Sequence, residues 1–285
     1  MTDVSLLDAA LLLLTGATAG WIGVLVGIGG GVVVVPVLFV GLGVDFRVAV
    51  ATALVGVLAT SVTAGTVHAA SGVGNLRLGV VLELATTIGA VVGGLVATLL
   101  ATSVLSGIFA VVAAATAVYL VIGIRHPVAR TAEASEGEVV EHTLGGAYFD
   151  GRRGGLVRYR VERLPVGLGI SAVAGGLSGL LGVGGGFIKV PTLNLIMKVP
   201  IRVAAATSNF MVGLTAAASI FVYFAAGYVV PLIAAPVAIG VVAGSIAGAL
   251  RARLSHPDRI RALLATILVL VAIEMALRAG GIGVI

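Results

Sequence analysis

Eight long stretches of this 285-residue chain contain almost no charged residue, and they constrain its fold more than any other feature. They lie at residues 6–44, 48–70, 78–100, 104–124, 166–197, 203–226, 229–250 and 262–277. A helix needs about 20 apolar residues to cross a bilayer, so most of these stretches are long enough. Charged residues make up only 10% of the chain, against about 25% in a soluble domain. The chain is therefore predicted to be an all-α polytopic protein of the cell (inner) membrane.

A glycine-rich motif interrupts two of these stretches. Residues 27–36 read GIGGGVVVVP, and residues 182–191 read GVGGGFIKVP. The offset of 155 residues between the copies holds far beyond the motif, since it also relates Gly93 to Gly248. One register over most of the chain indicates an internal repeat.

The repeat divides the chain into a first transmembrane repeat, a linker and a second transmembrane repeat, at residues 1–124, 125–165 and 166–285. Seven arginines place the linker in the cytoplasm by the positive-inside rule. Its many charges favour a solvated loop, although glycine turns between β-type runs are also compatible with a small hairpin. The arginine-rich loop that begins at Arg251 is expected on the same side of the membrane.

These two cytoplasmic loops constrain the number of crossings between them, which must be even. Residues 166–197 therefore contribute either two crossings or a re-entrant hairpin, with the bend at the glycine motif. Each half then crosses an odd number of times, which predicts two inverted-topology repeats of about four to five transmembrane segments each, eight to ten in total. Both termini are expected outside. The N-terminus lacks a basic region before its apolar stretch, so it is not interpreted as a cleaved signal.

Each glycine motif is predicted to break a helix at membrane depth. Irregular backbone is tolerated there only when it is buried in protein or lines a wet cavity. The helix that begins after each break has free N–H groups and a positive dipole end, and two inverted halves bring the two breaks together near the midplane, where they would suit an anion. The glycines predicted to bind it are Gly29, Gly30, Gly31, Gly184, Gly185 and Gly186. Close helix packing through small residues is the alternative.

A nucleotide-binding interpretation of the motif fails, because GxGxxG requires glycine where Val32 and Phe187 stand. Instead, the pattern GxGGGxxxxPxL, present here as GIGGGVVVVPVL and GVGGGFIKVPTL, resembles the TauE/SafE family, also called the 4-toluene sulfonate uptake permease family. The resemblance covers nearly the whole chain except the linker, whose length departs from the family pattern. It implies secondary transport of sulfite, sulfoacetate, sulfonates or related small organic anions, often as export.

Three basic residues are candidate contacts for an anion. Lys189 lies three residues after the last glycine of the second motif, in the first turn of the predicted helix, and its repeat partner is Val34, so this charge is one-sided. An ionisable residue inside a membrane segment indicates function, with snorkelling to the interface as the alternative. Arg47 and Arg202 each open an R-V-A-x-A-T motif. Their planar forks suit oxyanions, but either arginine is equally suited to anchor a helix end.

Hydroxyl and amide side chains add further candidates. Thr52 and Thr207 occupy matched positions in the two halves, and Ser208 and Asn209 follow only in the second. This polar cluster is able to donate several hydrogen bonds to an oxyanion, with interhelical hydrogen bonding as the alternative. The predicted substrate site is therefore asymmetric and weighted to the second half.

Glu83, Glu274 and His68 are the candidates for coupling to a proton or another ion, although each lies close enough to a segment end to favour an interface position. No catalytic or metal-binding motif is present, so no enzyme activity, metal or cofactor is expected. The net charge of +5 does not indicate nucleic acid, because the arginines gather in one loop and at helix ends.

The function that these residues and the resemblance favour is secondary active transport of a small anion by alternating access at a midplane site between the repeats. A channel-like anion pathway and a membrane sensor or scaffold acting through the linker are the alternatives. The exact substrate, the direction, the coupling ion and the oligomeric state are left open.

Overall fold

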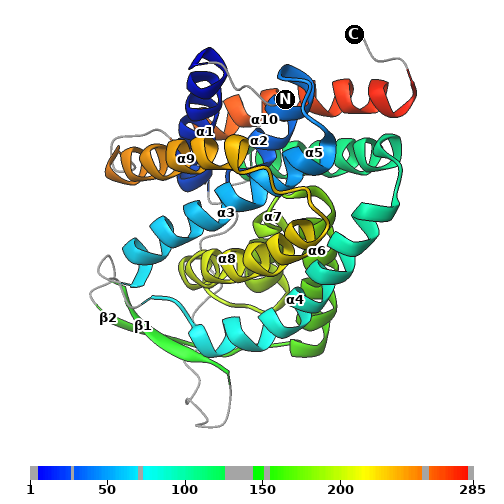
Figure 1. The fold of residues 1–285 in the computed structure, drawn as a ribbon. Coiled ribbons are helices and arrows are strands. Elements are labelled where there is room, and N and C mark those ends of the chain that lie inside the picture. Colours follow the sequence, from blue (N-terminus) through cyan, green and yellow to red (C-terminus); the bar gives the residue numbers. More distant parts are fainter. Residues whose placement is uncertain are drawn as a thin grey trace.

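The computed structural model describes residues 6–26, 29–69, 73–125, 144–150, 155–251 and 257–281. In this part of the chain, eight helices are long and apolar enough to cross a membrane. The first half supplies α1 (Leu6–Val26), α3 (Phe46–Ala69), α4 (Leu76–Leu99) and α5 (Thr102–Arg125). The second half supplies α6 (Leu164–Leu181), α8 (Ile201–Ala225), α9 (Pro231–Arg251) and α10 (Pro257–Ala279) (Figure 1). The prediction of an all-α polytopic membrane protein is confirmed.

A short broken helix follows the first long helix of each half. It consists of α2 (Gly31–Pro36) and the π-helical turn η1 (Val37–Gly41) in the first half, and of α7 (Gly186–Pro191) and the π-helical turn η2 (Thr192–Ile196) in the second. Both α-helical pieces end at the proline of the motif. Proline has no N–H and its ring crowds the preceding turn, so the helix widens where it continues. The glycines thus begin each short helix, and the proline changes its pitch.

The second broken helix returns to the end of the molecule from which α6 started. The backbone N–H of Glu162, just before α6, donates to the Met197 carbonyl, just after η2, at 3.1 Å. Gly167 in the first turn of α6 also packs against the Met197 side chain. Residues 164–197 therefore form a helical hairpin, and the glycine motif is its bend.

The long helices of the two halves pair with one another through glycines. A methyl group at Gly20 of α1 would collide with the Val241 carbonyl of α9, and one at Gly175 of α6 would collide with the Thr86 carbonyl of α4. Both members of the second pair lie 155 residues from those of the first, so equivalent helices make equivalent contacts. Close backbone approach of this kind requires glycine, because any Cβ would separate the helices.

Both of these pairs run parallel. Leu13 contacts Gly240 and Trp21 contacts Gly248, so residue numbers rise together along α1 and α9. In the same way, α4 and α6 approach at Thr86 with Gly175 and, one turn later, at Ala90 with Gly179.

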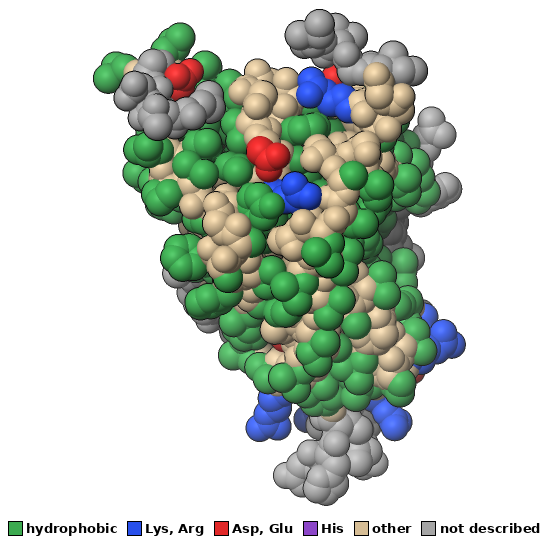
Figure 2. All heavy atoms as spheres, turned by 45° about the vertical axis from the view of Figure 1, so that its right-hand side comes forward, with side chains coloured by type: hydrophobic (Ala, Val, Ile, Leu, Met, Phe, Trp, Pro, Cys, Tyr) green, Lys and Arg blue, Asp and Glu red, His purple; other side chains and the backbone are tan. Residues whose placement is uncertain are grey.

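The outward faces of the long helices are apolar. On α4, side chains one turn apart are exposed, as at Leu84, Ile88, Val92, Leu95 and Leu99. Figure 2 shows one face of the molecule, where hydrophobic side chains predominate and charged side chains lie mostly toward the upper and lower ends. Such a surface suits contact with lipid rather than water.

Part of the linker is a β-hairpin. Strand β1 (Gly146–Asp150) pairs antiparallel with β2 (Gly155–Tyr159). For these residues, the favoured prediction of a solvated loop is wrong and the alternative, a small hairpin, is confirmed. Val157 and Tyr159 on β2 are buried, because alternate residues of this strand face the helices rather than solvent. Residues 126–143 and 151–154 of the predicted linker lie outside the described residues.

Asn75 attaches this hairpin to the helices. Its amide donates to the Leu144 carbonyl at 2.8 Å and to the Tyr159 hydroxyl at 3.0 Å. Its side-chain oxygen caps α4 by accepting from the Leu78 N–H at 3.0 Å, and its own N–H donates to the Thr207 hydroxyl of α8. Burial raises the pKa of the Tyr159 phenol, so this contact stays neutral. One side chain thus joins the hairpin, α4 and α8.

Candidate functional site

The glycine breaks of the two halves touch. Gly31, the first residue of α2, packs directly against the carbonyl of Gly182, where α6 ends. Gly182 in turn packs against the Val50 backbone of α3. The two interruptions predicted from the repeated motif therefore lie at one place between the halves, surrounded by protein.

Left-handed backbone explains why three of the predicted glycines are glycine. Gly29, Gly184 and Gly185 have φ values of +78°, +75° and +69°, a region that other residues adopt only with strain. Gly186 follows as the first residue of α7.

At Gly30 and Gly185, close approach of neighbouring backbone leaves no space for a side chain. A Cβ at Gly30 would lie 2.8 Å from the Ala19 carbonyl oxygen, and one at Gly185 would lie 3.0 Å from that of Ala174, the equivalent position in the second half. In this conformation Gly30, Gly31 and Gly185 therefore pack closely against neighbouring backbone, as the alternative of close helix packing expects. Gly29 instead faces side chains and a small cavity.

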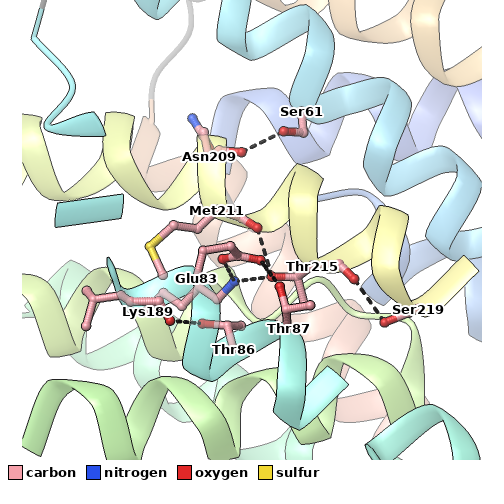
Figure 3. Close-up of polar contacts among 10 residues, drawn as sticks. Ser61, Glu83, Thr86, Thr87, Lys189, Asn209, Met211, Thr215 and Ser219 are labelled. Carbon is pink, nitrogen blue, oxygen red and sulfur yellow. Dashed lines mark hydrogen bonds and ion pairs between the residues drawn. The ribbon is translucent and has the colours of Figure 1, made fainter. Parts of the chain in front are cut away.

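Lys189 is at the centre of a buried charged network beside the second break. Figure 3 shows Glu83, Lys189 and Thr215 converging from α4, α7 and α8. The Lys189 ammonium donates to the Thr215 hydroxyl at 2.6 Å and lies 3.6 Å from Glu83 Oε2. The side chains of Lys189 and Glu83 are 1% and 6% exposed. Lys189 therefore does not snorkel to an interface, since its charge is held inside the helices.

The interface position favoured for Glu83 is wrong. This carboxylate is buried, with Oε1 accepting from Thr215 at 2.7 Å and from Thr87 at 3.3 Å. Among the described residues, Oε2 finds no hydrogen-bond partner. Glu83 is held inside because an opposite charge on another helix meets it there, which makes burial of both tolerable.

The polar cluster of the second half is buried but divided between different neighbours. Thr207 accepts from the Asn75 N–H at 3.0 Å, whereas the hydroxyls of Ser208 and of Thr52 have no partner within the described part of the chain. Asn209 accepts at its backbone carbonyl from the Ser61 hydroxyl at 2.6 Å (Figure 3). Interhelical hydrogen bonding thus describes Thr207, while Thr52 and Ser208 keep unused donors.

Two cavities meet at Ser61. The larger, which we call the vestibule, has a volume of about 430 Å³ and lies between α3 and α8 beside the start of α4, with mostly apolar walls such as Leu58, Phe210 and Leu214. The smaller, of about 10 Å³, has room for about one water molecule and is bounded by Gly29, Asn209 and Ser61 among others. Ser61 lines both, so this side chain lies between the vestibule and the small cavity beside Gly29.

The two predicted arginines lie away from this network. Arg47 closes the end of α4, because its guanidinium donates to the carbonyls of Ala97 at 3.1 Å and Leu100 at 2.6 Å and lies over the Tyr228 ring. Arg202 is exposed in the first turn of α8. The alternative interpretation, an arginine that anchors a helix end, describes Arg47.

Glu274, another coupling candidate, is also separate from Glu83. Glu274 on α10 accepts from Arg278 at 3.0 Å one turn later, and both side chains are partly exposed, as an interface position would have them. His68 lies near the end of α3, and its side chain is outside the described residues.

Sequence reasoning treated Lys189 and Glu83 as separate candidates and missed Thr215 and Ser61. A signal for the pairing was present: both charges are one-sided, because their repeat positions are Val34 and Ala238. Opposite charges that stand alone in apolar segments are expected to pair across helices. No periodicity distinguishes Thr215 or Ser61 from other small polar residues of these helices.

A helical bundle with an internal repeat, two broken helices that meet and a buried charged pair beside one of them is typical of membrane transport proteins. The family model described as sulfite exporter TauE/SafE matches residues 12–275. The chain belongs to this family.

A curated relative supports the same class. The chain is 25% identical over 272 residues to the probable membrane transporter protein YunE of Bacillus subtilis (strain 168). The aligned region covers 93% of this chain and 96% of the relative. No solved structure matches the chain. The family and this relative support membrane transport by a multi-pass membrane protein.

Proposed function

We propose that this protein is a secondary active transporter that carries small anions by alternating access between its two halves. The observation that carries the proposal is Lys189, a cation buried at a helix break, where the two halves touch. A buried ammonium attracts an anion strongly because little water competes for it. Its present partner, Glu83, shows that this position accepts a negative charge.

Access from one side at a time is consistent with the cavities. The vestibule reaches Gly213 and Leu214 on one face of α8, while Thr215 on the adjoining face holds Lys189. Helix α8 therefore separates the open cavity from the cation. A movement of α8 relative to α3 would connect them, which is the kind of rigid-body change that alternating access requires.

We further propose that the two halves have inverted topology. Helix α8 runs in the same direction as α6, because the Tyr223 hydroxyl near its end donates to the Gly179 carbonyl near the end of α6 at 2.9 Å. Helix α9 follows after a short connection and runs back, and α1 is parallel to α9. Helices α1 and α6, which occupy the same position in the two halves, then point in opposite directions.

The proposed substrates are sulfite, organosulfonates or related organic anions, and the proposed physiological direction is export. Membership of the TauE/SafE family supports this class, and the name of that family refers to sulfite export. A sulfur oxyanion also suits the site chemically, since its several oxygens accept hydrogen bonds from an ammonium and from a hydroxyl such as that of Thr215, which contacts Lys189.

A thermal-shift screen of the purified protein tests the proposal. The probes are sulfite, sulfate, thiosulfate, sulfoacetate, taurine and simple carboxylates. A sulfur oxyanion should raise the apparent stability, because a ligand that binds only the native state stabilises it. If none of these anions shifts the transition and none is taken up by proteoliposomes, the proposed substrate class is wrong.

Transport kinetics distinguish a carrier from a channel-like pathway. Uptake of a binding anion into proteoliposomes should saturate and show counterflow. Unsaturated flux without counterflow would support the channel instead.

A further inference from the structure

We propose that the transported anion and Glu83 compete for Lys189, so that each anion bound brings one proton onto Glu83. This inference rests on the proposed function and names the coupling ion of the same site. It joins two roles in one charged network, with Lys189 as the anion-binding group and Glu83 as the proton-binding group.

The first observation is that the ion pair is loose. Lys189 Nζ lies 3.6 Å from Glu83 Oε2, beyond hydrogen-bond distance, and its hydrogen bond at 2.6 Å goes to Thr215 instead. Oε2 is buried and accepts no hydrogen bond from any described residue. A purely structural buried pair would be expected to satisfy its oxygens. We therefore place the coupled proton on this oxygen.

The second observation is that Thr215 has two acceptors for one proton. Its hydroxyl lies 2.7 Å from Glu83 Oε1 and 2.8 Å from the Met211 carbonyl. A hydroxyl donates only one hydrogen bond at a time. When Glu83 is protonated, Thr215 is able to donate to Met211 and still accept from Lys189. The Thr215 hydroxyl therefore keeps one donated and one accepted hydrogen bond when Glu83 is neutral.

The third observation is that the described helices packed around Glu83 carry little other charge. Helix α4 packs against α6 and α8. Helix α6 has no titratable residue, α7 and η2 have only Lys189, and α8 has only Arg202 in its first turn and Tyr223 in its last. On α4 itself, the other charged residue is Arg77, in the first turn.

The chemistry follows from these charges. An anion that pairs with the Lys189 ammonium leaves a buried carboxylate beside a second negative charge, which is unfavourable where water is scarce. A proton from solution relieves this by bonding to Glu83 Oε2 and forming a neutral carboxylic acid. For a monovalent anion, the net charge of the site is zero before and after. Anion and proton therefore move in the same direction, and a cell that accumulates the anion exports the two together.

Calorimetric titration of the wild-type protein with methanesulfonate tests this coupling without a variant. Methanesulfonate stays ionised across the working pH range, so any proton taken up belongs to the protein. Titration in buffers of different ionisation enthalpy should show uptake of about one proton per anion. In the alkaline range, the affinity should fall about tenfold per pH unit. Binding without proton uptake overturns the inference and leaves the proposed function standing.

The substitution Glu83→Gln assigns the proton. This variant should bind methanesulfonate without proton uptake and with an affinity that no longer depends on pH, since the competing carboxylate is gone. Glu162→Gln is the matched control, because Glu162 is exposed before α6 and should leave the proton uptake unchanged. A pH dependence retained in Glu83→Gln overturns the assignment. If the variant does not fold, the wild-type titration still decides whether a proton is coupled.

Failure of the proposed function has a different result. If neither methanesulfonate nor sulfite binds the wild-type protein, the anion site is wrong, and the coupling fails with it.

Discussion

At the scale of single residues, the chain departs from its own repeat at the charged site. The positions equivalent to Lys189, Glu83 and Thr215 in the other half are Val34, Ala238 and Thr60. Thr60 donates to the Gly56 carbonyl of its own helix, with no charge to bind. A duplicated scaffold therefore holds one charged network rather than two, because an unneeded buried ion pair costs desolvation energy.

Removal of the charge on Lys189 should weaken anion binding. In the double variant Lys189→Met with Glu83→Gln, no buried carboxylate is left unpaired, so packing and stability should change little. Relative to Glu83→Gln alone, anion affinity should fall by about 1.5–3 kcal/mol, which is roughly 10- to 150-fold. Substrate titration of the purified variant measures this. Affinity within about twofold of that of Glu83→Gln would move the anion site away from Lys189.

The single substitution Lys189→Arg provides the complementary test. A guanidinium keeps the charge but is wider and directs its hydrogen bonds differently. It should recover only part of the affinity, measured in the same titration.

At the scale of elements, the glycine breaks require both left-handed backbone and close approach. Gly185 begins the turn into α7 with φ at +69° and packs against α6. Gly43 has a similar φ of +63°, but a Cβ there would meet nothing within 4 Å. A comparison of substitutions at these two glycines therefore distinguishes the effect of backbone strain from the effect of close packing at the break.

Gly185→Ala should reduce transport much more than Gly43→Ala. Both variants place alanine in the left-handed region, at about 1–2 kcal/mol each, so both should unfold at slightly lower temperature. Only Gly185→Ala also presses a methyl group onto the Ala174 carbonyl and displaces the turn that carries Lys189. Uptake by proteoliposomes, compared with thermal unfolding, distinguishes the two effects. Equal transport by both variants would indicate that the break has a packing role alone.

The linker hairpin shows why local composition was a poor guide to that element. Its arginines and acids resemble a solvated loop, and β1 and β2 are only five residues each. What orders the hairpin is distant in sequence: Asn75 binds it, and Tyr159 and Val157 are buried. Charge content along a segment does not report such contacts.

At the scale of the whole molecule, the proposed topology assigns opposite ends of the helices to opposite sides of the membrane. Ala147 on β1 and Ala226 after α8 are both exposed. Because the chain contains no cysteine, one introduced at either position is a unique label.

Ala147→Cys should react with an impermeant thiol reagent only after cells are opened, whereas Ala226→Cys should react in intact cells. The reason is that the arginine-rich linker stays cytoplasmic, and α8 starts near it and crosses to the other side. The reverse labelling pattern would invert the orientation, and labelling of both in intact cells would contradict the eight-span arrangement.

The sequence by itself determined the membrane class, the long helices, the repeat and the position of both breaks. These follow from local properties: apolar length, a constant offset of 155 residues and glycine followed by proline. Each of these properties is visible in the order of residues along the chain, so no knowledge of contacts between distant residues is needed to recognise it.

Only the tertiary structure decided that Lys189 and Glu83 share one site, that Thr215 joins them, and that Arg47 caps α4 instead. Each of these depends on which helices are neighbours and on how they are rotated. That arrangement is set by glycine contacts between the halves. At each contact, a backbone carbonyl of one helix lies where a Cβ of the facing helix would be, and this fixes the register of the two helices. The chemistry of each charge is therefore local, but its partner is a property of the packed bundle.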